Sequence, residues 1–320
     1  MSKASKIWLV IAASLAALGI IIFGVIMTML KWDFLKLGTV KYETNIYEID
    51  ESFQNISIKT NTADITVLSS DDGKVKVACH ESEKEKYSIS VENDTLIINI
   101  TNNKKWYDYI GISIGSQKIT LYLPESEYGA LAIRESTGKV ELTDGFKFES
   151  IDISVSAGDV VSGASASDFV KIKANTGHIS VSDISAGAIE LSATTGDIKA
   201  SDIICEGDVY IKVTTGKTKL TNVECKNLTT VGNTGDISLT SVIVNENISI
   251  KRSTGDVIFD RCDAAELRVV TDTGDVKGSL LTEKIFVTRT STGKKNVPET
   301  TSGGICEITT NTGDIIINIK

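Results

Sequence analysis

The stretch ISIKRSTGDV (residues 248–257) holds the pattern that decides the fold of this chain. Its centre is a Thr-Gly-Asp turn, and related turns return ten times between residues 136 and 314, at spacings of only 19 or 20 residues. A fixed period of this length is typical of stacked repeats, in which each unit needs its neighbours to bury its apolar side chains. The repeated glycines are Gly138, Gly158, Gly177, Gly196, Gly216, Gly235, Gly255, Gly274, Gly293 and Gly313.

Apolar residues recur at fixed offsets from each repeated glycine. Every repeat has one seven residues before the glycine, and most have others five residues before it and two residues after it. Thr230 and Thr288 are the polar exceptions five residues before the glycine. Thr218 and Lys295 are the polar exceptions two residues after it. Because these offsets alternate with polar residues, they indicate strands that are buried on one face.

A further apolar pair often follows seven and nine residues after the glycine, as in Ile203 with Cys205 and Val242 with Val244. Three short strands per repeat, separated by turns, predict an all-β fold, a roughly triangular parallel β-solenoid with coils of 19 to 20 residues. Ten coils at about 4.8 Å would make a rod of about 45 Å. Only two prolines and an abundance of Thr, Ser, Ile and Val favour the same fold class.

Each repeated glycine is interpreted as a corner of the coil. A corner that recurs at one angle needs a backbone that tolerates positive φ, and glycine adopts this conformation without strain. The Ser, Thr or Asn side chains before the glycine and the Asp after it are able to satisfy the amides of the turn. The glycines are therefore expected to be structural residues.

The position after the glycine forms a ladder of charged residues along the predicted rod. Lysines interrupt its acids, so that Asp236, Asp256 and Asp275 form the one unbroken acidic run, flanked by Lys217 and Lys294. These three aspartates are a weak candidate for a cation site; the alternative is a solvated ladder that caps turns, because calcium prefers six to eight oxygen ligands. The ladder residues are Lys139, Asp159, His178, Asp197, Lys217, Asp236, Asp256, Asp275, Lys294 and Asp314.

Residues 7–30 form an apolar run without a charge. At about 1.5 Å per residue, a helix of this length spans a hydrocarbon core of about 30 Å. The run therefore predicts an N-terminal transmembrane helix, with a buried core helix and a cleaved signal peptide as the alternatives. It is long for the apolar region of a signal peptide, and no small-x-small cleavage site precedes Lys31.

The orientation of this helix is predicted from its flanks. Lys3 and Lys6 precede it, but Lys31, Lys36 and Lys41 follow it, so the positive-inside rule nearly ties. A short basic head before an apolar run resembles an export signal, which favours an uncleaved signal anchor in the cell membrane, with a single pass and an extracytoplasmic β domain. The predicted divisions are a cytoplasmic tail (1–6), the transmembrane helix (7–30), a juxtamembrane linker with a first strand (31–53), irregular N-terminal β coils (54–125) and regular solenoid repeats (126–320).

The irregular region holds one degenerate coil and one aromatic loop. In the coil, Ala63 takes the place of the glycine. The loop at residues 104–111 contains Trp106, Tyr107 and Tyr109. We expect it either to pack as a cap on the first coil or to serve as an interaction loop, since aromatic side chains make large contacts at low entropic cost.

Five cysteines do not make a dense disulfide framework. Cys205 and Cys225 each lie nine residues after a repeated glycine, in consecutive coils, so they should stack about 4.8 Å apart. A disulfide between them is geometrically possible. The alternative is a pair of buried thiols that act as small apolar core residues.

Composition and motifs disfavour several classes of function. The formal net charge of −9, without a clustered basic stretch, disfavours nucleic-acid binding. The two histidines, His80 and His178, lie in unrelated contexts, so no Ser/His/Asp or Cys/His constellation is indicated. No zinc spacing and no phosphate-binding loop is recognised, and no cofactor is expected. The chain is predicted not to be an enzyme.

With the repeats aligned, the chain resembles the DUF4097 family of bacterial β-strand repeat proteins, which are regarded as candidate adhesins. The resemblance covers roughly residues 45–320 and rests on the pattern of residues 248–257 and on the lead-in KITLYLP at residues 118–124. It implies a cell-envelope protein with no assigned catalytic residues.

Three hypotheses about function remain. The first is a membrane-tethered extracytoplasmic module, structural or adhesin-like, that presents a rigid surface to an unknown protein or cell-wall partner. The second is a carbohydrate-acting β-helix enzyme. The third is a self-assembling envelope scaffold, because residues 314–320 form an apolar strand with no evident cap, and an exposed end of a solenoid normally needs covering.

Overall fold

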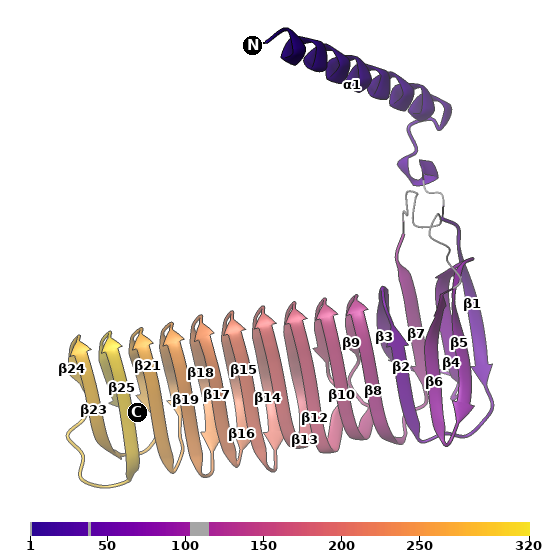
Figure 1. The fold of residues 1–320 in the computed structure, drawn as a ribbon. Helices are drawn as coiled ribbons and strands as arrows, with labels where there is room; N and C mark the ends of the chain where they lie inside the picture. Colours follow the sequence, from indigo (N-terminus) through magenta and orange to yellow (C-terminus); the bar gives the residue numbers. More distant parts are fainter. Residues whose placement is uncertain (1, 38–39, 103–114) are drawn as a thin grey trace.

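The computed structural model spans the full chain, and its structure is described for all residues except 1, 38–39 and 103–114. Figure 1 shows one helix that leads, through a group of antiparallel strands, into a long stack of coils. The chain is a parallel β-solenoid with an N-terminal helix, as the period of the repeats predicts.

The N-terminal helix α1 (Lys3–Met29) begins at Ser2, whose hydroxyl accepts a hydrogen bond from the backbone N–H of Ser5 at 3.2 Å. Its most apolar window has a mean hydropathy of 2.8, and none of that window is buried against the rest of the chain. The helix ends where Lys31 and Trp32 adopt positive φ, and a short 3-10 helix, η1 (Phe34–Leu37), follows. By length and composition, α1 is able to cross a membrane.

Each coil contributes one strand that ends at the corner glycine and one strand that begins after it. Strand β13 (Ile179–Thr195) is long enough to serve as both: its first half follows Gly177 and its second half leads to Gly196. Strands that lead in form the pre-glycine sheet: β2 (Asn55–Thr60), β8 (Glu127–Thr137), β10 (Lys147–Ala157), β12 (Ser165–Thr176), the second half of β13, β15 (Asp208–Thr215), β17 (Asn227–Thr234), β19 (Asn247–Thr254), β21 (Glu266–Thr273), β23 (Lys284–Thr292) and β25 (Gly304–Thr312). Strands that leave form the post-glycine sheet: β3 (Ala63–Ser69), β9 (Val140–Leu142), β11 (Val160–Ser162), the first half of β13, β14 (Ile198–Cys205), β16 (Thr218–Cys225), β18 (Ile237–Val244), β20 (Val257–Cys262), β22 (Val276–Leu280), β24 (Lys295–Asn296) and β26 (Ile315–Ile319).

In five successive coils, the second and third strands predicted from the sequence are joined in a single strand that bends. The bend lies at the sixth residue after the glycine, which takes a left-handed conformation in five successive coils. This residue changes the alternation of side chains, so that Ile203 and Cys205, seven and nine residues after Gly196, return to the core. The core therefore has a third side, without a separate third strand. The left-handed residues are Asp183, Asp202, Asn222, Ser241 and Arg261.

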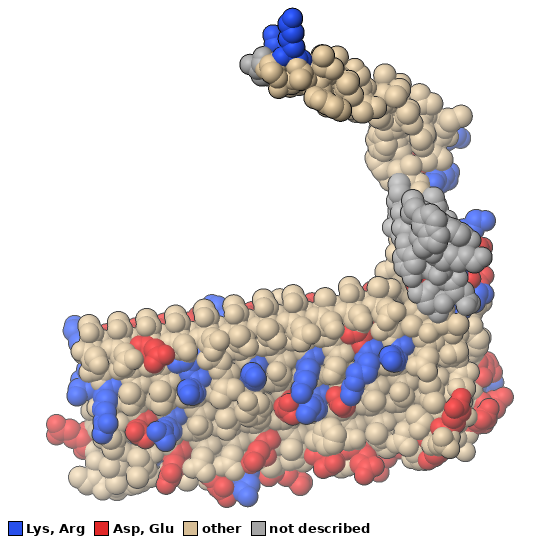
Figure 2. All heavy atoms as spheres, in the orientation of Figure 1, with Lys and Arg blue, Asp and Glu red and all other residues tan. Residues whose placement is uncertain are grey.

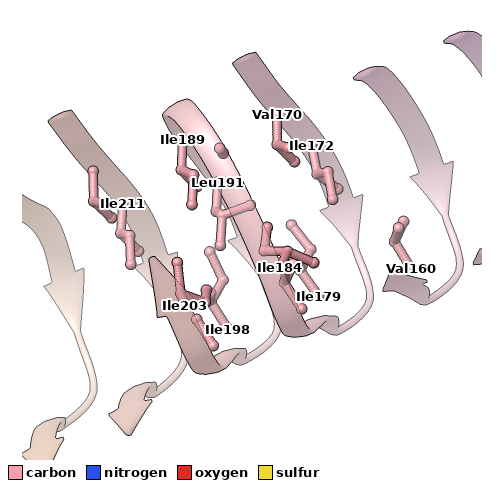
Figure 3. Close-up of a cluster of buried hydrophobic side chains, with 14 of the residues drawn as sticks. Val160, Val170, Ile172, Ile179, Ile184, Ile189, Leu191, Ile198, Ile203 and Ile211 are labelled. Atoms are coloured by element: carbon pink, nitrogen blue, oxygen red, sulfur yellow. The ribbon is translucent and has the colours of Figure 1, made fainter. Parts of the chain in front are cut away.

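The core is a continuous column of aliphatic side chains along the inside of the coils. Figure 3 shows part of it, with Ile189 and Leu191 from the pre-glycine sheet facing Ile184 and Ile198 from the post-glycine sheet. All four are buried, with at most 3% of their surface exposed. Parallel pairing in register, for example Ile189 opposite Val209, places equivalent side chains of successive coils in direct contact.

Five strands at the N-terminal end form a mixed cap on the stack. The cap strands are β1 (Tyr42–Ile49), β4 (Val75–Ser82), β5 (Glu85–Glu92), β6 (Thr95–Asn102) and β7 (Gln117–Leu123). Strand β4 pairs antiparallel with β1 and β7, and β5 pairs antiparallel with β6. Because β6 and β7 also pair parallel with β2 and β3, they connect the antiparallel cap to the solenoid.

Coils at both ends of the stack are out of chain order. At the N-terminal end, the coil β2–β3 lies between β6–β7 and β8–β9. At the C-terminal end, the coil β25–β26 lies between β21–β22 and β23–β24, which Figure 1 shows as β25 between β21 and β23. Stacking in chain order, which the spacing of the repeats predicts, is wrong for both end coils.

The last strand of the chain is consequently not the outermost strand of the stack. Ile315 and Ile316 in β26 pair with β22 on one side and with β24 on the other. The outermost coil is β23–β24, and it carries Lys294, Lys295 and Pro298. Lysine and proline are residue types that discourage pairing at exposed sheet edges. Self-association through residues 314–320 stays a prediction, but these residues are not the end of the solenoid.

Replacement of Gly235 by Val tests the corner geometry. Gly235 has a φ of +125°, and an added Cβ would lie 2.0 Å from the carbonyl oxygen of Gly216 in the preceding coil. We expect Gly235→Val to lower the free energy of unfolding by about 3 kcal/mol or more, measured by thermal and urea denaturation. Gly73→Val is the matched control, because Gly73 also has positive φ but an added Cβ there meets nothing within 4 Å. Equal losses in the two variants would contradict a role for close stacking.

Candidate functional site

The ladder residues that follow the corner glycines bind the backbone of the next coil. In the regular part of the ladder, Asp159 Oδ1 accepts a hydrogen bond from the backbone N–H of His178 at 2.7 Å, and Asp256 Oδ1 accepts one from Asp275 at 2.8 Å. The amide of the corner glycine instead donates to a carbonyl oxygen of the next coil, as Gly255 N–H does to Thr273 O at 2.9 Å. The carboxylate therefore satisfies the one corner amide that the backbone ladder leaves unpaired.

The exchanged order of the last coils changes the charge pattern of the ladder. Asp314 N–H donates to Asp275 Oδ1 at 2.7 Å, and Lys294 N–H donates to Asp314 Oδ1 at 2.8 Å. The unbroken acidic run therefore has four members in space, Asp236, Asp256, Asp275 and Asp314, where the sequence order indicated three.

Lysines neutralise part of this run. Lys217 Nζ lies 3.1 Å from Asp236 Oδ2, and Lys277 Nζ lies 2.5 Å from Asp275 Oδ2. The hydrogen bonds from these two lysines lower the pKa of Asp236 and of Asp275. Among the residues that the structure describes, no group of three or more His, Cys, Asp or Glu side chains is arranged to hold a metal ion. The geometry of the ladder thus agrees with a capping role for Asp236, Asp256 and Asp275.

One of the residues that interrupt the apolar rows, Thr218, belongs to a polar inclusion inside the core. Arg252 is only 2% exposed, and its Nη1 donates to Val213 O at 2.8 Å, while its Nη2 lies 3.4 Å from Thr218 Oγ1. The guanidinium occupies the space beside Gly232, where an added Cβ would lie 2.1 Å from Nη1. Burial lowers the pKa of Arg252. Gly232 thus leaves room for the Arg252 guanidinium, and Thr218 places a hydroxyl group beside it where most other coils have an apolar residue.

Two buried carboxyl groups lie near the N-terminal end of the stack. Glu81 in the cap accepts hydrogen bonds from the backbone N–H of Tyr87 at 2.6 Å and from Asn45 Nδ2 at 2.8 Å. Glu135, only 4% exposed, accepts from Thr137 N–H at 2.9 Å through Oε1, while its Oε2 has no partner among the described residues. Burial raises the pKa of Glu135 to about 7.

The outward side of the pre-glycine sheet carries a row of basic residues, which we call the basic row. Each member lies four residues before the corner glycine of its coil, and strand pairing places the members of neighbouring coils opposite one another. In most of the stack, every second member is a lysine or an arginine. Figure 2 shows lysine and arginine side chains spread along this face, and acidic side chains gathered along one long edge. In stacking order the basic row is Lys59, Arg134, Ser154, Lys173, Ser192, Lys212, Val231, Lys251, Val270, Thr309 and Arg289.

Two hollows open on this face. One, of about 320 Å³, is bordered by Lys59, Arg134 and Lys173 of the basic row. The other, of about 550 Å³, is bordered by Phe169 and Tyr210, with Lys171, Glu190 and Asp208 around them. Tyr210 is 38% exposed, so part of its ring is open to a ligand. This face was not predicted from the sequence, because its residues come from different repeats and no local motif marks them.

The aromatic loop, the cysteines and the histidines that the sequence singled out do not form a common site among the described residues. The predicted interaction loop with Trp106, Tyr107 and Tyr109 lies outside the described residues. All five cysteines are buried free thiols, so Cys205 and Cys225 are not bonded, and burial raises the pKa of Cys225 to about 12. His80 stacks on Tyr42 in the cap, with ring centroids 5.3 Å apart, whereas His178 Nδ1 accepts a hydrogen bond from the backbone of Asp197 in the ladder.

A comparison with family models finds a match over most of the chain. The family model described as Toastrack DUF4097 matches residues 53–318. A comparison with curated proteins finds no match.

Among solved structures, a candidate adhesin from Bacteroides fragilis is 15% identical, with a TM-score of 0.43, and the match covers 87% of this chain and 97% of that one. A candidate lipid-binding protein from Parabacteroides distasonis is 16% identical, with a TM-score of 0.49, over 75% of this chain and 98% of that one. A candidate adhesin from Parabacteroides merdae is 14% identical, with a TM-score of 0.49, over 75% and 97%. Likenesses this distant carry no information about ligands.

Replacement of Asp256 tests the capping role of the ladder. Asp256→Ala removes the acceptor for the Asp275 amide, and we expect it to lower the free energy of unfolding by about 1–2 kcal/mol. Asp256→Asn keeps an oxygen at the same position and should cost less. Calcium at millimolar concentration should leave the melting temperature of the wild type unchanged. A calcium-dependent rise in melting temperature that Asp256→Asn abolishes would instead support a cation site.

The buried Glu135 carboxyl predicts a pH dependence of stability. Its pKa is about 7 in the folded chain, above the usual value of 4.5. The protonated Glu135 side chain therefore makes its full contribution to stability below about pH 4.5. This contribution is lost as the pH rises towards about 7, and above that pH the stability no longer changes through this group. Glu135→Gln should be the more stable protein at pH 8, by up to about 3 kcal/mol, and this advantage should shrink near pH 5. Parallel melting temperatures of the two proteins across this range would contradict the assignment.

Proposed function

Because the chain belongs to the Toastrack DUF4097 family, we propose that it is a non-enzymatic, membrane-tethered binding module that lies on the extracytoplasmic side of the cell membrane. The observation that carries this proposal is the pre-glycine sheet, a long face on which outward side chains of successive coils form straight rows. Such a face offers the same chemistry repeatedly along one direction. Extended concave or flat faces of this kind are the surfaces that solenoid proteins use for binding.

The tether in this proposal is α1, which carries charged residues only near its amino end and exposes its apolar side chains. The cap strands stand between the helix and the stack, so one end of the rod is attached to the membrane anchor. An uncleaved anchor with its amino terminus in the cytoplasm would hold the basic row outside the cell. The partner would be a component of the cell envelope.

Protease shaving tests the topology and the anchor together. The full chain carries one epitope at each end, and intact cells or spheroplasts are treated with protease before and after permeabilisation. We expect the C-terminal epitope to disappear from intact spheroplasts and the N-terminal epitope to disappear only after permeabilisation. Protection of the C-terminal epitope until permeabilisation would contradict the extracytoplasmic location.

The same samples distinguish an anchor from a cleaved signal sequence. Intact-mass measurement of the purified chain should retain residues 3–29, and the protein should stay in the membrane fraction after washing with salt and alkali. A mature chain that lacks this helix would contradict the tether. Release of soluble sugars from envelope glycans by the purified protein would contradict the non-enzymatic assignment and favour the carbohydrate-acting alternative.

A further inference from the structure

We propose that the pre-glycine face binds a linear acidic polysaccharide, which lies along the rod with its carboxylates on the basic row and one sugar ring on Tyr210. This inference rests on the proposed function, since it names the ligand class of the binding face. Three observations support it: the spacing of the cations, two lysines in the middle of the row that have no ion-pair partner among the described residues, and the aromatic hollow beside the row.

The spacing of the cations follows from the strand register. Arg134, Lys173, Lys212 and Lys251 occupy one row, and each pair is separated by a coil with an uncharged residue in the same row. Two coils correspond to about 9.6 Å along the rod. This is close to the advance of two sugar rings in an extended chain. A polysaccharide that alternates an acidic ring with a neutral ring therefore presents its carboxylates at the period of the row.

The middle of the row is not neutralised by the protein. Arg134 pairs with Asp152 at 2.6 Å, and Lys173 lies 3.4 Å from Glu190. In contrast, Lys212 and Lys251 have no carboxylate within 4.0 Å among the described residues, although the chain as a whole has an excess of acids. Glu190 and Asp208 border the hollow beside Lys212, but neither forms an ion pair with this lysine, so its ammonium group is available to an anion. An anionic ligand supplies the missing partner.

The hollow beside the row provides a place for a sugar ring. Tyr210 and Lys212 are successive outward residues of β15, and Phe169, Lys171 and Lys173 are successive outward residues of β12. Between the two aromatic residues is Ala188, whose small side chain leaves the hollow open. Aromatic rings pack against the apolar faces of sugars, while nearby carboxylates and lysines bind hydroxyl groups. This combination is expected for a glycan and is not required for a simple polyanion.

The spacing and the hollow together disfavour a nucleic acid as the ligand. A nucleic-acid strand carries a phosphate about every 3.4 Å, so most of its charges would have no cation on the row. A single row with an uncharged residue at alternate coils is too sparse for such a ligand. An acidic glycan with one charge for every two rings uses each cation once.

The test measures binding of a defined glycan to the full chain in nanodiscs of zwitterionic lipid. The probe is a hyaluronate oligosaccharide of about ten rings, in which acidic and neutral rings alternate, and binding is measured by calorimetry at two salt concentrations. Saturable binding that weakens with salt is expected. Lys212→Gln with Lys251→Gln should weaken it about tenfold, and Tyr210→Ala should weaken it several-fold.

Matched variants on the post-glycine sheet serve as controls. Lys199→Gln with Lys219→Gln removes the same charge from exposed lysines of β14 and β16, and Ile258→Ala removes an exposed apolar side chain of β20. These variants should bind the probe as the wild type does. A neutral glucan of the same length should not bind.

Three results would overturn the proposal. The first is an absence of hyaluronate binding, and the second is an equal loss in the control variants. The third is equal binding of a single-stranded oligonucleotide without any effect of Tyr210→Ala, which would indicate a non-specific cationic surface. Because binding in nanodiscs does not depend on topology in the cell, its failure is distinct from failure of the proposed location, which protease shaving measures separately.

Discussion

The contact between successive corner glycines is the constraint on which the rest of the structure depends. In the regular part of the stack, the carbonyl oxygen of one glycine lies 1.9 to 2.2 Å from the place where a Cβ of the next would be. Only glycine permits this approach at positive φ, so the corners of all coils lie directly above one another. Strands that start from aligned corners pair in register, and their inward side chains form the continuous core. Their outward side chains form straight rows, so the corner also decides where charged residues meet on the surface.

Polar groups at the corner and in the core show how the stack tolerates exceptions. The ladder aspartates accept the hydrogen bond of the corner amide, and a lysine at the same position leaves the next amide without this carboxylate acceptor. Inside the core, Arg252 crosses from its own coil to Val213 O, two coils away. This is possible because Gly232 leaves room and Thr218 replaces an apolar residue. A buried cation without a directly bound carboxylate is costly, so the smaller and more polar neighbours belong to the same local arrangement.

The two ends of the solenoid are built differently from its middle. At each end the coil closest to the chain terminus is held between two others, so its backbone groups pair on both sides over most of the strand. The N-terminal end is closed by antiparallel strands, and the C-terminal end presents Lys294, Lys295 and Pro298 at its outer edge. These devices limit fraying and edge pairing. They also leave the lateral faces as the largest regular surfaces, which is why the binding proposal concerns the pre-glycine sheet.

The sequence by itself determined the repeat, the corner glycines, the inward rows and the apolar helix, because each of these depends on residues close together in the chain. It also indicated, through Thr218, where an apolar row is interrupted, but it did not indicate that the buried Arg252 lies beside this residue. Only the tertiary structure decided the bend at the left-handed residues such as Asp202, which no glycine marks, and the exchanged order of the end coils. Pairing preferences of neighbouring strands are too similar to distinguish one order of coils from another. The fourth member of the acidic run and the position of Tyr210 in one hollow with Phe169 and Lys171 follow from stacking, so sequence reasoning within single repeats could not find them.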